Sequence, residues 1–337
     1  MRIQQVIFQQ PREATLEARD LDVDNLRPAE LVIASEASLI SQGTEGAAWQ
    51  GLTMPGGQDW TYPQQPGYAN VGRIIAAGDD VPFAIGDRVF SMAKHASHAR
   101  IDLTRELCVA VPDGVTPQQA VFARLAVVSM STLRTTSARM GDKAAVVGLG
   151  MVGNLAAQLC QIAGLFTTGI DVIPWRCDMA RTCGIETVLL APSEDDLTRD
   201  HALVIEATGT EAGARTGIRL VQKHGELSLV GSQWGKGAQD MDALRFLGTV
   251  FEQYIHIRSG WEWQIPTVPT PFGASSLSHS ASAILQWIAA GRLKVDPLLS
   301  HLVAPDDCGF VYGEMVANKD RYLGVVFDWS GASEATA

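Results

Sequence analysis

A glycine-rich turn between an apolar strand and a helix constrains this chain more than any other feature. Residues 144–153 read AAVVGLGMVG, a short apolar run with Gly-x-Gly-x-x-Gly spacing, and a helix is predicted to follow over Asn154–Ala163. In such a turn Gly148 permits a sharp bend, Gly150 lets a pyrophosphate approach the backbone, and Gly153 lets helix and strand pack closely. The helix N-terminus then offers free N–H groups and a positive dipole to the phosphates.

The segment after this turn favours a dinucleotide site. Residues 167–170 form a second strand pattern ending at Asp171, which lies about 20 residues beyond the turn, where a ribose-binding carboxylate is expected. A carboxylate there binds the ribose hydroxyls of NAD and repels the 2′-phosphate of NADP, so we expect NAD. Arg176 leaves NADP open, because a nearby arginine can accept that phosphate. The alternative is a glycine-rich turn in an ordinary α/β protein.

Length and charge narrow the class of protein. The 337 residues are enough for about two domains. A net charge of −11 argues against nucleic acid or an anionic membrane as the main partner. No apolar run approaches the roughly 18 residues that span a bilayer, and residues 1–8 are too polar for a signal peptide, so we expect a cytoplasmic protein. The five cysteines show no Cys-x-x-Cys spacing, which argues against a disulfide framework or a structural zinc knuckle.

The pattern of elements changes near residue 120. Before it, strand-like segments separated by turn signals predict a mostly antiparallel β domain. After it, strands and helices alternate, which predicts a parallel, doubly wound sheet. Helices are predicted over 117–138, 176–183, 212–221 and 278–290, and a last strand over 323–327.

Several short motifs, in this order, carry a family resemblance. They are Pro66–Gly72, Gly86–Val89, Val111–Gly114, Gly148–Gly153, Asp171–Arg176, Ala207–Gly209, Val230–Ser232 and Pro297–His301. Over nearly its whole length the chain resembles the medium-chain dehydrogenase/reductase superfamily, the alcohol-dehydrogenase-like proteins. The resemblance implies an α/β fold with two domains and an active site in the cleft between them. Residues 1–122 and 260–337 would form a GroES-like, β-rich catalytic domain, and residues 123–259 a Rossmann domain with a doubly wound parallel sheet.

The resemblance also implies an NAD(P) cofactor and a homodimer, since the last Rossmann strand often pairs across a dimer in this family. The implied cofactor contacts are Gly148, Gly150, Met151, Val152, Gly153, Asp171, Val172, Arg176, Thr208, Gly209, Val230, Gly231 and Ser232.

Many members of the family bind a catalytic zinc, and here this sequence departs from them. The family has a Cys where this chain has Ser41, His-Glu where it has Tyr68-Ala69, and a Cys or Glu near Ala123 or Arg124. Zinc requires three or four N, S or O ligands, so we expect no metal. The segment Ser41–Glu45 is similar to the Ser-x-Gly-Thr-Glu stretch of a zinc-independent subset that includes bacteriochlorophyllide-type dehydrogenases and proteins of sugar and secondary-metabolite pathways.

Without a metal, a hydrogen-bond donor or an acid/base must polarise the substrate oxygen. The candidates are Thr44, Glu45, Tyr68 and His95, with Ser41 and Lys94 beside them in the sequence. Tyr68 either donates to a carbonyl oxygen or fills the space that the metal site has vacated. His95 is either a proton relay or a structural histidine, and Glu45 either holds substrate hydroxyls or caps the next turn.

These observations predict a zinc-independent oxidoreductase that interconverts a secondary alcohol and a ketone. The small-molecule substrate would be polyhydroxylated or cyclic: a sugar, a cyclitol or a secondary-metabolite intermediate. The loop Trp261–Trp263 would form a substrate wall or a subunit interface. Two alternatives stay open: an NADPH-dependent enoyl or quinone reductase, and a non-catalytic dinucleotide-binding protein.

Overall fold

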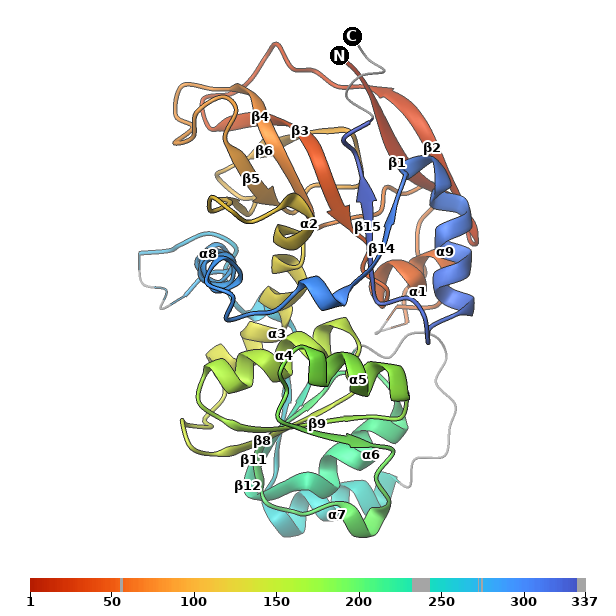
Figure 1. Cartoon of the computed structure of the whole chain (residues 1–337), viewed down its shortest axis with the longest axis vertical. Helices are drawn as coiled ribbons and strands as arrows, with labels where there is room; N and C mark the ends of the chain where they lie inside the picture. Colours follow the sequence, from red (N-terminus) through yellow and green to blue (C-terminus); the bar gives the residue numbers. More distant parts are fainter. Residues whose placement is uncertain (55–56, 232–242, 272, 274, 332–337) are drawn as a thin grey trace.

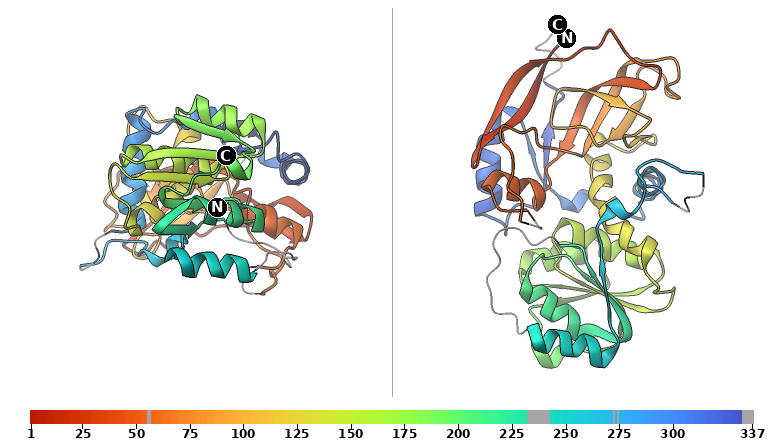
Figure 2. Two further views of the ribbon diagram at one scale, coloured as in Figure 1. Left: turned by 90° about the horizontal axis from the view of Figure 1, so that it is seen from below. Right: turned by 180° about the vertical axis from the view of Figure 1, so that it is seen from behind.

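Two large sheets organise the chain in the computed structural model, one at each end of the molecule (Figure 1). The structure describes residues 1–54, 57–231, 243–271, 273 and 275–331. Helices lie between the sheets and on both faces of the lower one, as the views of Figures 1 and 2 show together. No helix of the described residues is long and apolar enough to cross a membrane.

The upper, seven-stranded sheet has the order β14-β15-β3-β4-β5-β7, and β6 also pairs with β3. Its pairings are antiparallel except for β14 with β15, which is parallel. The sheet therefore joins strands from distant parts of the sequence. A separate hairpin precedes it. The bounds are β1 Arg2–Gln10, β2 Glu13–Asp20, β3 Glu30–Leu39, β4 Asn70–Ala77, β5 Arg88–Ser91, β6 His98–Asp102, β7 Cys108–Ala110, β14 Leu299–Val303 and β15 Gly324–Asp328.

The lower, six-stranded sheet is parallel throughout and has the order β10-β9-β8-β11-β12-β13. The strand order reverses direction between β8 and β11, so the carboxyl end of β8 lies at the point where doubly wound sheets bind ligands. The strands are β8 Lys143–Val147, β9 Phe166–Asp171, β10 Thr187–Leu190, β11 His201–Glu206, β12 Val221–Leu229 and β13 His256–Ser259. The helices are α4 Met151–Ile162, α5 Pro174–Thr182, α6 Glu211–Leu220 and α7 Ala243–Gln253.

The remaining helices lie at the junction and around the upper sheet (Figure 1). They are α1 Thr44–Gln50, α2 Pro117–Ala120, α3 Ala123–Thr135, α8 Leu277–Ala289 and α9 Cys308–Ala317, and a 3₁₀ turn, η2, covers Glu262–Gln264. Helix α2 starts with a capping box, in which the Thr116 hydroxyl accepts from the Gln119 N–H and the Gln119 amide oxygen accepts from the Thr116 N–H.

Several predicted boundaries were wrong. The single helix expected over 117–138 is split into α2 and α3 and ends at Thr135, because Thr136 and Ser137 turn away to donate hydrogen bonds to Glu226 on β12. Helix α4 starts at Met151, three residues early, since Gly150 in an extended conformation is its N-cap. The helix expected to reach Val221 ends one residue sooner, and Val221 begins β12. Helices α1, α7 and α9 were not predicted.

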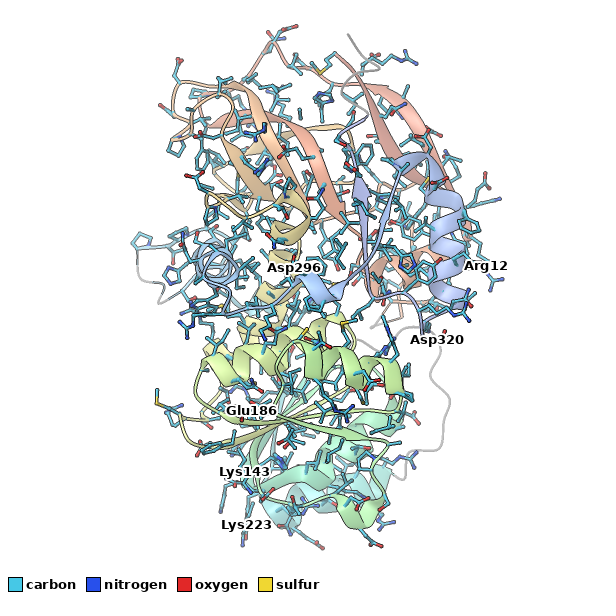
Figure 3. All side chains as sticks on the ribbon, in the orientation of Figure 1. Arg12, Lys143, Glu186, Lys223, Asp296 and Asp320 are labelled. Carbon is cyan, nitrogen blue, oxygen red and sulfur yellow. The ribbon has the colours of Figure 1, made fainter. Side chains whose placement is uncertain are left out.

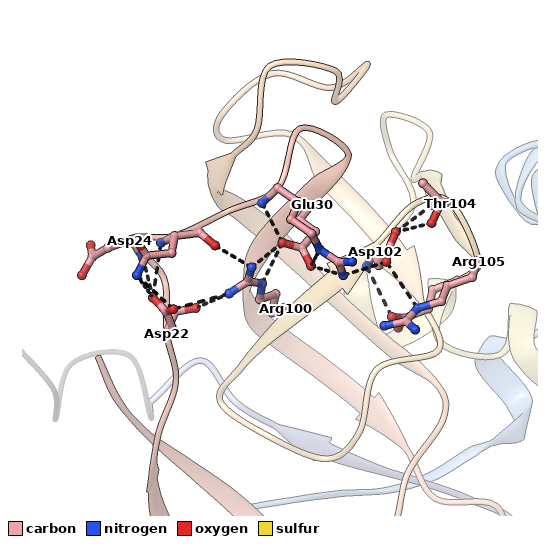
Figure 4. Close-up of polar contacts among 10 residues, drawn as sticks. Asp22, Asp24, Glu30, Arg100, Asp102, Thr104 and Arg105 are labelled. Atoms are coloured by element: carbon pink, nitrogen blue, oxygen red, sulfur yellow. Dashed lines mark hydrogen bonds and ion pairs between the residues drawn. The ribbon is translucent and has the colours of Figure 1, made fainter.

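A network of charges ties β3 to β6 at the outer end of the upper sheet (Figure 4). Glu30 and Asp102 are paired across the two strands, and like charges placed opposite each other are destabilising. Arg27 Nη2 relieves this by donating to Glu30 Oε1 (2.6 Å) and Asp102 Oδ2 (2.9 Å), and Arg100 Nε donates to Glu30 Oε2 (3.0 Å). The hydrogen bonds from Arg27 and then Arg100 lower the pKa of Glu30 to about 2.

Candidate active site

The glycine turn leaves an open cradle at the N-terminus of α4. Gly148 has a φ of 92°, a conformation that favours glycine. A Cβ on Gly153 would lie 1.7 Å from the Gly148 carbonyl oxygen, so only glycine allows this approach of helix to turn. A Cβ on Gly150, in contrast, would meet only Arg176 Nη1, at 3.9 Å. The space above Gly150 therefore fits a pyrophosphate close to the backbone.

Asp171 is buried at the carboxyl end of β9, beside this cradle. Its two carboxylate oxygens accept from the Leu149 N–H (2.7 Å) and the Ile173 N–H (2.9 Å). Each oxygen keeps a lone pair for a ribose hydroxyl. Arg176 Nη1 lies 3.9 Å from Asp171 Oδ2, and Arg176 Nη2 donates to the Lys319 carbonyl (3.0 Å). Arg176 thus reaches from α5 across to the segment after α9.

The other predicted cofactor residues lie on the same edge of the sheet. Thr208 and Gly209 follow β11, and Val230 and Gly231 follow β12. The two turns touch, because a Cβ on Gly231 would lie 2.1 Å from the Gly209 nitrogen. Met151 and Val152 open α4, and Val172 is exposed next to Asp171. Ser232 lies outside the described residues.

A second cluster centres on Glu45, in the first turn of α1. Glu45 Oε1 accepts from the Ser41 N–H (2.9 Å), and Oε2 accepts from His95 Nε2 (2.9 Å) and from the Tyr312 hydroxyl (2.5 Å). The His95 ring is 0% exposed, and its Nδ1 lies 2.7 Å from Ser38 Oγ. Both ring nitrogens therefore have partners inside the protein, and His95 holds Glu45 in place.

Tyr68 lies half-buried next to this cluster, and its hydroxyl donates to Ser41 Oγ. Burial is the main effect that raises the pKa of Tyr68 above its usual value, and the Glu45 carboxylate adds to it, whereas the charge of Arg124 opposes it. Thr44, half-buried at the start of α1, also favours the ionised phenol. Lys94 is exposed. The structure thus brings Thr44, Glu45 and Tyr68 together.

Arg124 completes this cluster from the first turn of α3. Its guanidinium carbon lies 4.8 Å from the centre of the Tyr68 ring and 5.8 Å from that of Trp263. Arg124 Nη2 donates to Glu262 Oε1 (2.5 Å), and both residues are buried, with exposed fractions of 2% and 4%. The sequence analysis considered Arg124 only as the site of a lost metal ligand and missed Glu262.

Helix α3 connects this cluster to the glycine turn. Ser129, five residues after Arg124 on the same helix, donates to the Val152 carbonyl in α4 (2.8 Å). A five-residue step along a helix is about 7.5 Å. The Tyr68–Arg124 cluster and the cradle at Gly150 are therefore two parts of one region at the junction of the two sheets (Figure 1).

The residues at this junction do not fit a zinc site. Tyr68 contacts both Ser41 and Arg124, and a guanidinium has no lone pair to offer a metal. In the described part of the chain, no group of three or more His, Cys, Asp or Glu residues is arranged to hold a metal ion.

A hollow elsewhere in the molecule is distinct from this region. It has a volume of about 350 Å³ and is lined by residues at the amino ends of β8–β11, among them Lys143, Phe166 and Glu186; Lys143 and Glu186 are labelled in Figure 3. Because doubly wound sheets bind their ligands at the carboxyl ends of the strands, this hollow is not the candidate site.

Comparisons with known proteins agree with this geometry. A family model described as zinc-binding dehydrogenase matches residues 151–261. A 2-desacetyl-2-hydroxyethyl bacteriochlorophyllide A dehydrogenase from Rhodobacter capsulatus is 26% identical, with 90% of this chain and 92% of that protein covered. These similarities support the medium-chain dehydrogenase/reductase superfamily as the family of this chain.

One further relative matches about half of the chain, and one solved structure has a similar fold. A D-guloside 3-dehydrogenase from Shigella flexneri is 31% identical over 49% of this chain and 51% of its own length. The crystal structure of L-idonate 5-dehydrogenase from Escherichia coli superposes with a TM-score of 0.80 at 14% identity, covering 97% of this chain and 98% of that one. The predicted fold class, a GroES-like unit with a Rossmann unit, is confirmed, and the relatives named as dehydrogenases support an oxidoreductase.

Proposed function

We propose that this protein is a zinc-independent, NAD(P)-dependent dehydrogenase that interconverts a secondary alcohol and a ketone on a polyhydroxylated or cyclic small molecule. The observation that carries the proposal is the Tyr68–Ser41–Arg124 cluster, joined by α3 to the open cradle at Gly150. Relatives named for a guloside, an idonate and a bacteriochlorophyllide support a sugar-like or cyclic substrate.

The cradle and Asp171 support NAD(H) as the preferred cofactor. The pyrophosphate would lie over Gly150 and the N-terminus of α4, with Thr208, Gly209, Val230 and Gly231 forming the neighbouring rim. The buried Asp171 carboxylate would accept from the ribose hydroxyls. Arg176 is 3.9 Å from that carboxylate and already donates to Lys319. The positive charge of Arg176 is therefore partly neutralised, which favours NAD over NADP.

Oxidising a secondary alcohol removes a hydride from carbon, which the bound cofactor accepts, and releases the hydroxyl proton. We assign the proton to Tyr68, since its hydroxyl is hydrogen-bonded to Ser41 and the two form a short path away from the substrate. Glu45 fixes this path because it holds the backbone N–H of Ser41, while His95 and Tyr312 hold Glu45. Thr44 offers a second hydroxyl beside Tyr68.

Zinc independence rests on the donor chemistry of the cluster. A hydroxyl, a phenol and a guanidinium lie where they contact one another, and a cation, Arg124, is already present among them. A Zn²⁺ ion in the same space would be repelled by that charge, and the nearby carboxylates of Glu45 and Glu262 already accept hydrogen bonds from Ser41, His95, Tyr312 and Arg124.

The proposal also covers the localisation, the oligomeric state, the domain boundaries and the wall of the substrate site. We propose a cytoplasmic homodimer that pairs through β13, because β13 is the last strand on one side of the parallel sheet and its Ile257 is exposed. Residues 1–122 with 260–337, and residues 123–259, are our proposed domains. Trp263, 49% exposed beside Arg124, would form the wall of the substrate site.

A thermal-shift and fluorescence titration with NAD, NADH, NADP and NADPH tests the proposal, each with EDTA and with added zinc. We expect NAD or NADH to raise the melting temperature most, with no effect of EDTA, followed by turnover in a polyol and ketone panel. Loss of activity in EDTA that zinc restores would refute zinc independence. Turnover of enones or quinones with NADPH, without alcohol oxidation, would instead identify a reductase.

A further inference from the structure

Arg124 is a buried cation whose hydrogen-bonding capacity is only partly used. One hydrogen bond joins its Nη2 to Glu262, while Nε and Nη1 have no hydrogen-bond partner among the described residues. An unsatisfied buried donor costs about 1–3 kcal/mol, more when it is charged. Because most buried polar groups are paired, two unpaired donors on one buried side chain point to a ligand.

The position of Arg124 in the fold adds to this cost. It lies in the first turn of α3, where the helix dipole is positive and disfavours a second positive charge. The rings of Tyr68 and Trp263 offset part of the cost by cation–π attraction. The Nε and Nη1 donors of Arg124 still lack a hydrogen-bond acceptor, and together with the helix N-terminus they favour an oxygen that carries partial negative charge.

The neighbouring charges define which kind of oxygen fits. Arg124 and Glu262 form a pair with no net charge, and Glu45 lies close enough to act on Tyr68. A carboxylate or phosphate would find no surplus positive charge to balance it. A carbonyl or hydroxyl oxygen is uncharged when it binds and gains negative charge only as the reaction proceeds, so it matches the site.

We propose that Arg124 donates a hydrogen bond to the reacting oxygen of an uncharged substrate and stabilises the negative charge that develops there. This inference rests on the proposed dehydrogenase function. In ketone reduction the carbon gains a hydride from the reduced nicotinamide cofactor, the oxygen gains the proton of Tyr68, and Tyr68 regains a proton from solvent through the Ser41 hydroxyl. A guanidinium has hydrogen-bond donors and no acceptor, so Arg124 acts through its charge and its hydrogen bond and does not transfer a proton.

The test compares Arg124→Gln and Arg124→Lys with Arg134→Gln, an exposed arginine on the same helix. We expect Arg124→Gln to bind NADH within about twofold of wild type and to lose about 10²–10³-fold in kcat for ketone reduction. Arg124→Lys should keep part of the rate below neutral pH and lose it as the pH rises, since a buried lysine has a lowered pKa. Arg134→Gln should match wild type.

Two further variants separate catalysis from folding and charge. Arg124→Gln leaves Glu262 without its partner, so the double variant with Glu262→Gln repeats the kinetics should the single variant fail to fold. Glu262→Gln alone removes the negative charge that balances Arg124. We therefore expect the NADH complex of this variant to bind acetate at least about tenfold more tightly than that of wild type, because opposite charges attract strongly at short range.

Three results would overturn the inference. The first is that Arg124→Gln retains kcat within threefold or raises KM alone, which would make Arg124 a binding residue without a role in the reaction. The second is that wild type turns over only carboxylate- or phosphate-bearing substrates, which would make the Arg124 cluster an anion-binding site. A wild type that binds NADH and turns over no alcohol or ketone would refute the proposed function and the inference with it.

Discussion

Two glycines of the same turn should respond in opposite ways to the addition of one methyl group. Gly150→Ala places a Cβ in open space, where the nearest atom beyond the chain neighbours is Arg176 Nη1 at 3.9 Å. The backbone there has φ −60° and ψ −175°, which any residue adopts. Gly153→Ala places a Cβ 1.7 Å from a backbone carbonyl oxygen. The first change should leave the stability of the fold unchanged, and the second should lower it.

The magnitudes follow from these distances. Gly150→Ala reduces the entropy of the unfolded chain, so we expect a free energy of unfolding equal to wild type or up to about 1 kcal/mol higher. In Gly153→Ala the oxygen and the new carbon must separate to an ordinary contact of about 3.2 Å, a shift of roughly 1.5 Å in packed backbone, which costs about 3 kcal/mol or more by comparison with overpacked cores. At about 2–4 °C per kcal/mol, the melting temperature should fall by roughly 6–12 °C.

NADH binding distinguishes Gly150→Ala from wild type. Wild type at an NADH concentration of about 100 Kd should gain about 2.7 kcal/mol. Gly150→Ala should gain none, because its methyl group occupies the space that the pyrophosphate requires. The assay is a melting curve with and without NADH, checked by NADH fluorescence. Gly150→Ala that folds and binds NADH like wild type would refute the assignment of this cradle to the phosphates.

Three other predictions test the surrounding groups. Tyr68→Phe should lower kcat/KM by about 10²–10⁴-fold with unchanged NADH affinity, as expected for loss of an acid/base group; an unchanged rate would remove Tyr68 from the reaction. Tyr312→Phe deletes a different phenol from the Glu45 cluster, and should lower the free energy of unfolding by about 1–3 kcal/mol in urea titrations while Tyr68 chemistry continues. The pKa of Glu30 is about 2 in the folded protein against 4.5 as its ordinary value, so its stabilisation is complete above pH 4.5 and is lost as the pH falls toward 2. Glu30→Gln should therefore flatten the dependence of the urea midpoint on pH in that window, and an unaltered slope would contradict the assigned charge network.

The parallel sheet was predictable because its signals are local. Each buried strand is an apolar run, as in Ala144–Val147, and the glycine turn follows one of them directly. Helix α1 gave no such signal: it has seven residues, carries Gly46 inside, and its N-cap Gly43 has no side chain to accept a hydrogen bond. Val221 was assigned to a helix because the pattern before it is helical, whereas pairing with His201 in β11 draws it into a strand.

In the candidate site, too, the residues marked by a local pattern could be predicted from the sequence, and the long-range contacts could not. Asp171 was predicted as the ribose-binding residue from its spacing to the glycine turn, and the structure places its carboxylate against the Leu149 N–H of that turn. The Arg124–Glu262 pair joins residues 138 positions apart, and the Glu45–Tyr312 hydrogen bond joins residues 267 apart. No local pattern encodes such pairs. In the loop Trp261–Trp263, the aromatic residues attract notice in the sequence, but the buried carboxylate between them is the residue that meets Arg124.

The place of β15 in the upper sheet has a consequence for protein synthesis. Residues 37–39 of β3 pair with β15, which emerges from the ribosome only after the whole six-stranded sheet has been made. At about 5–20 residues per second, this delay is roughly 15–60 s. During that time the nascent chain carries an unpaired strand edge, in the last part beside a complete parallel sheet, and such an edge is a template for wrong pairing. The polysome is therefore where this protein is most exposed to misassembly, and where a chaperone that covers strand edges would act.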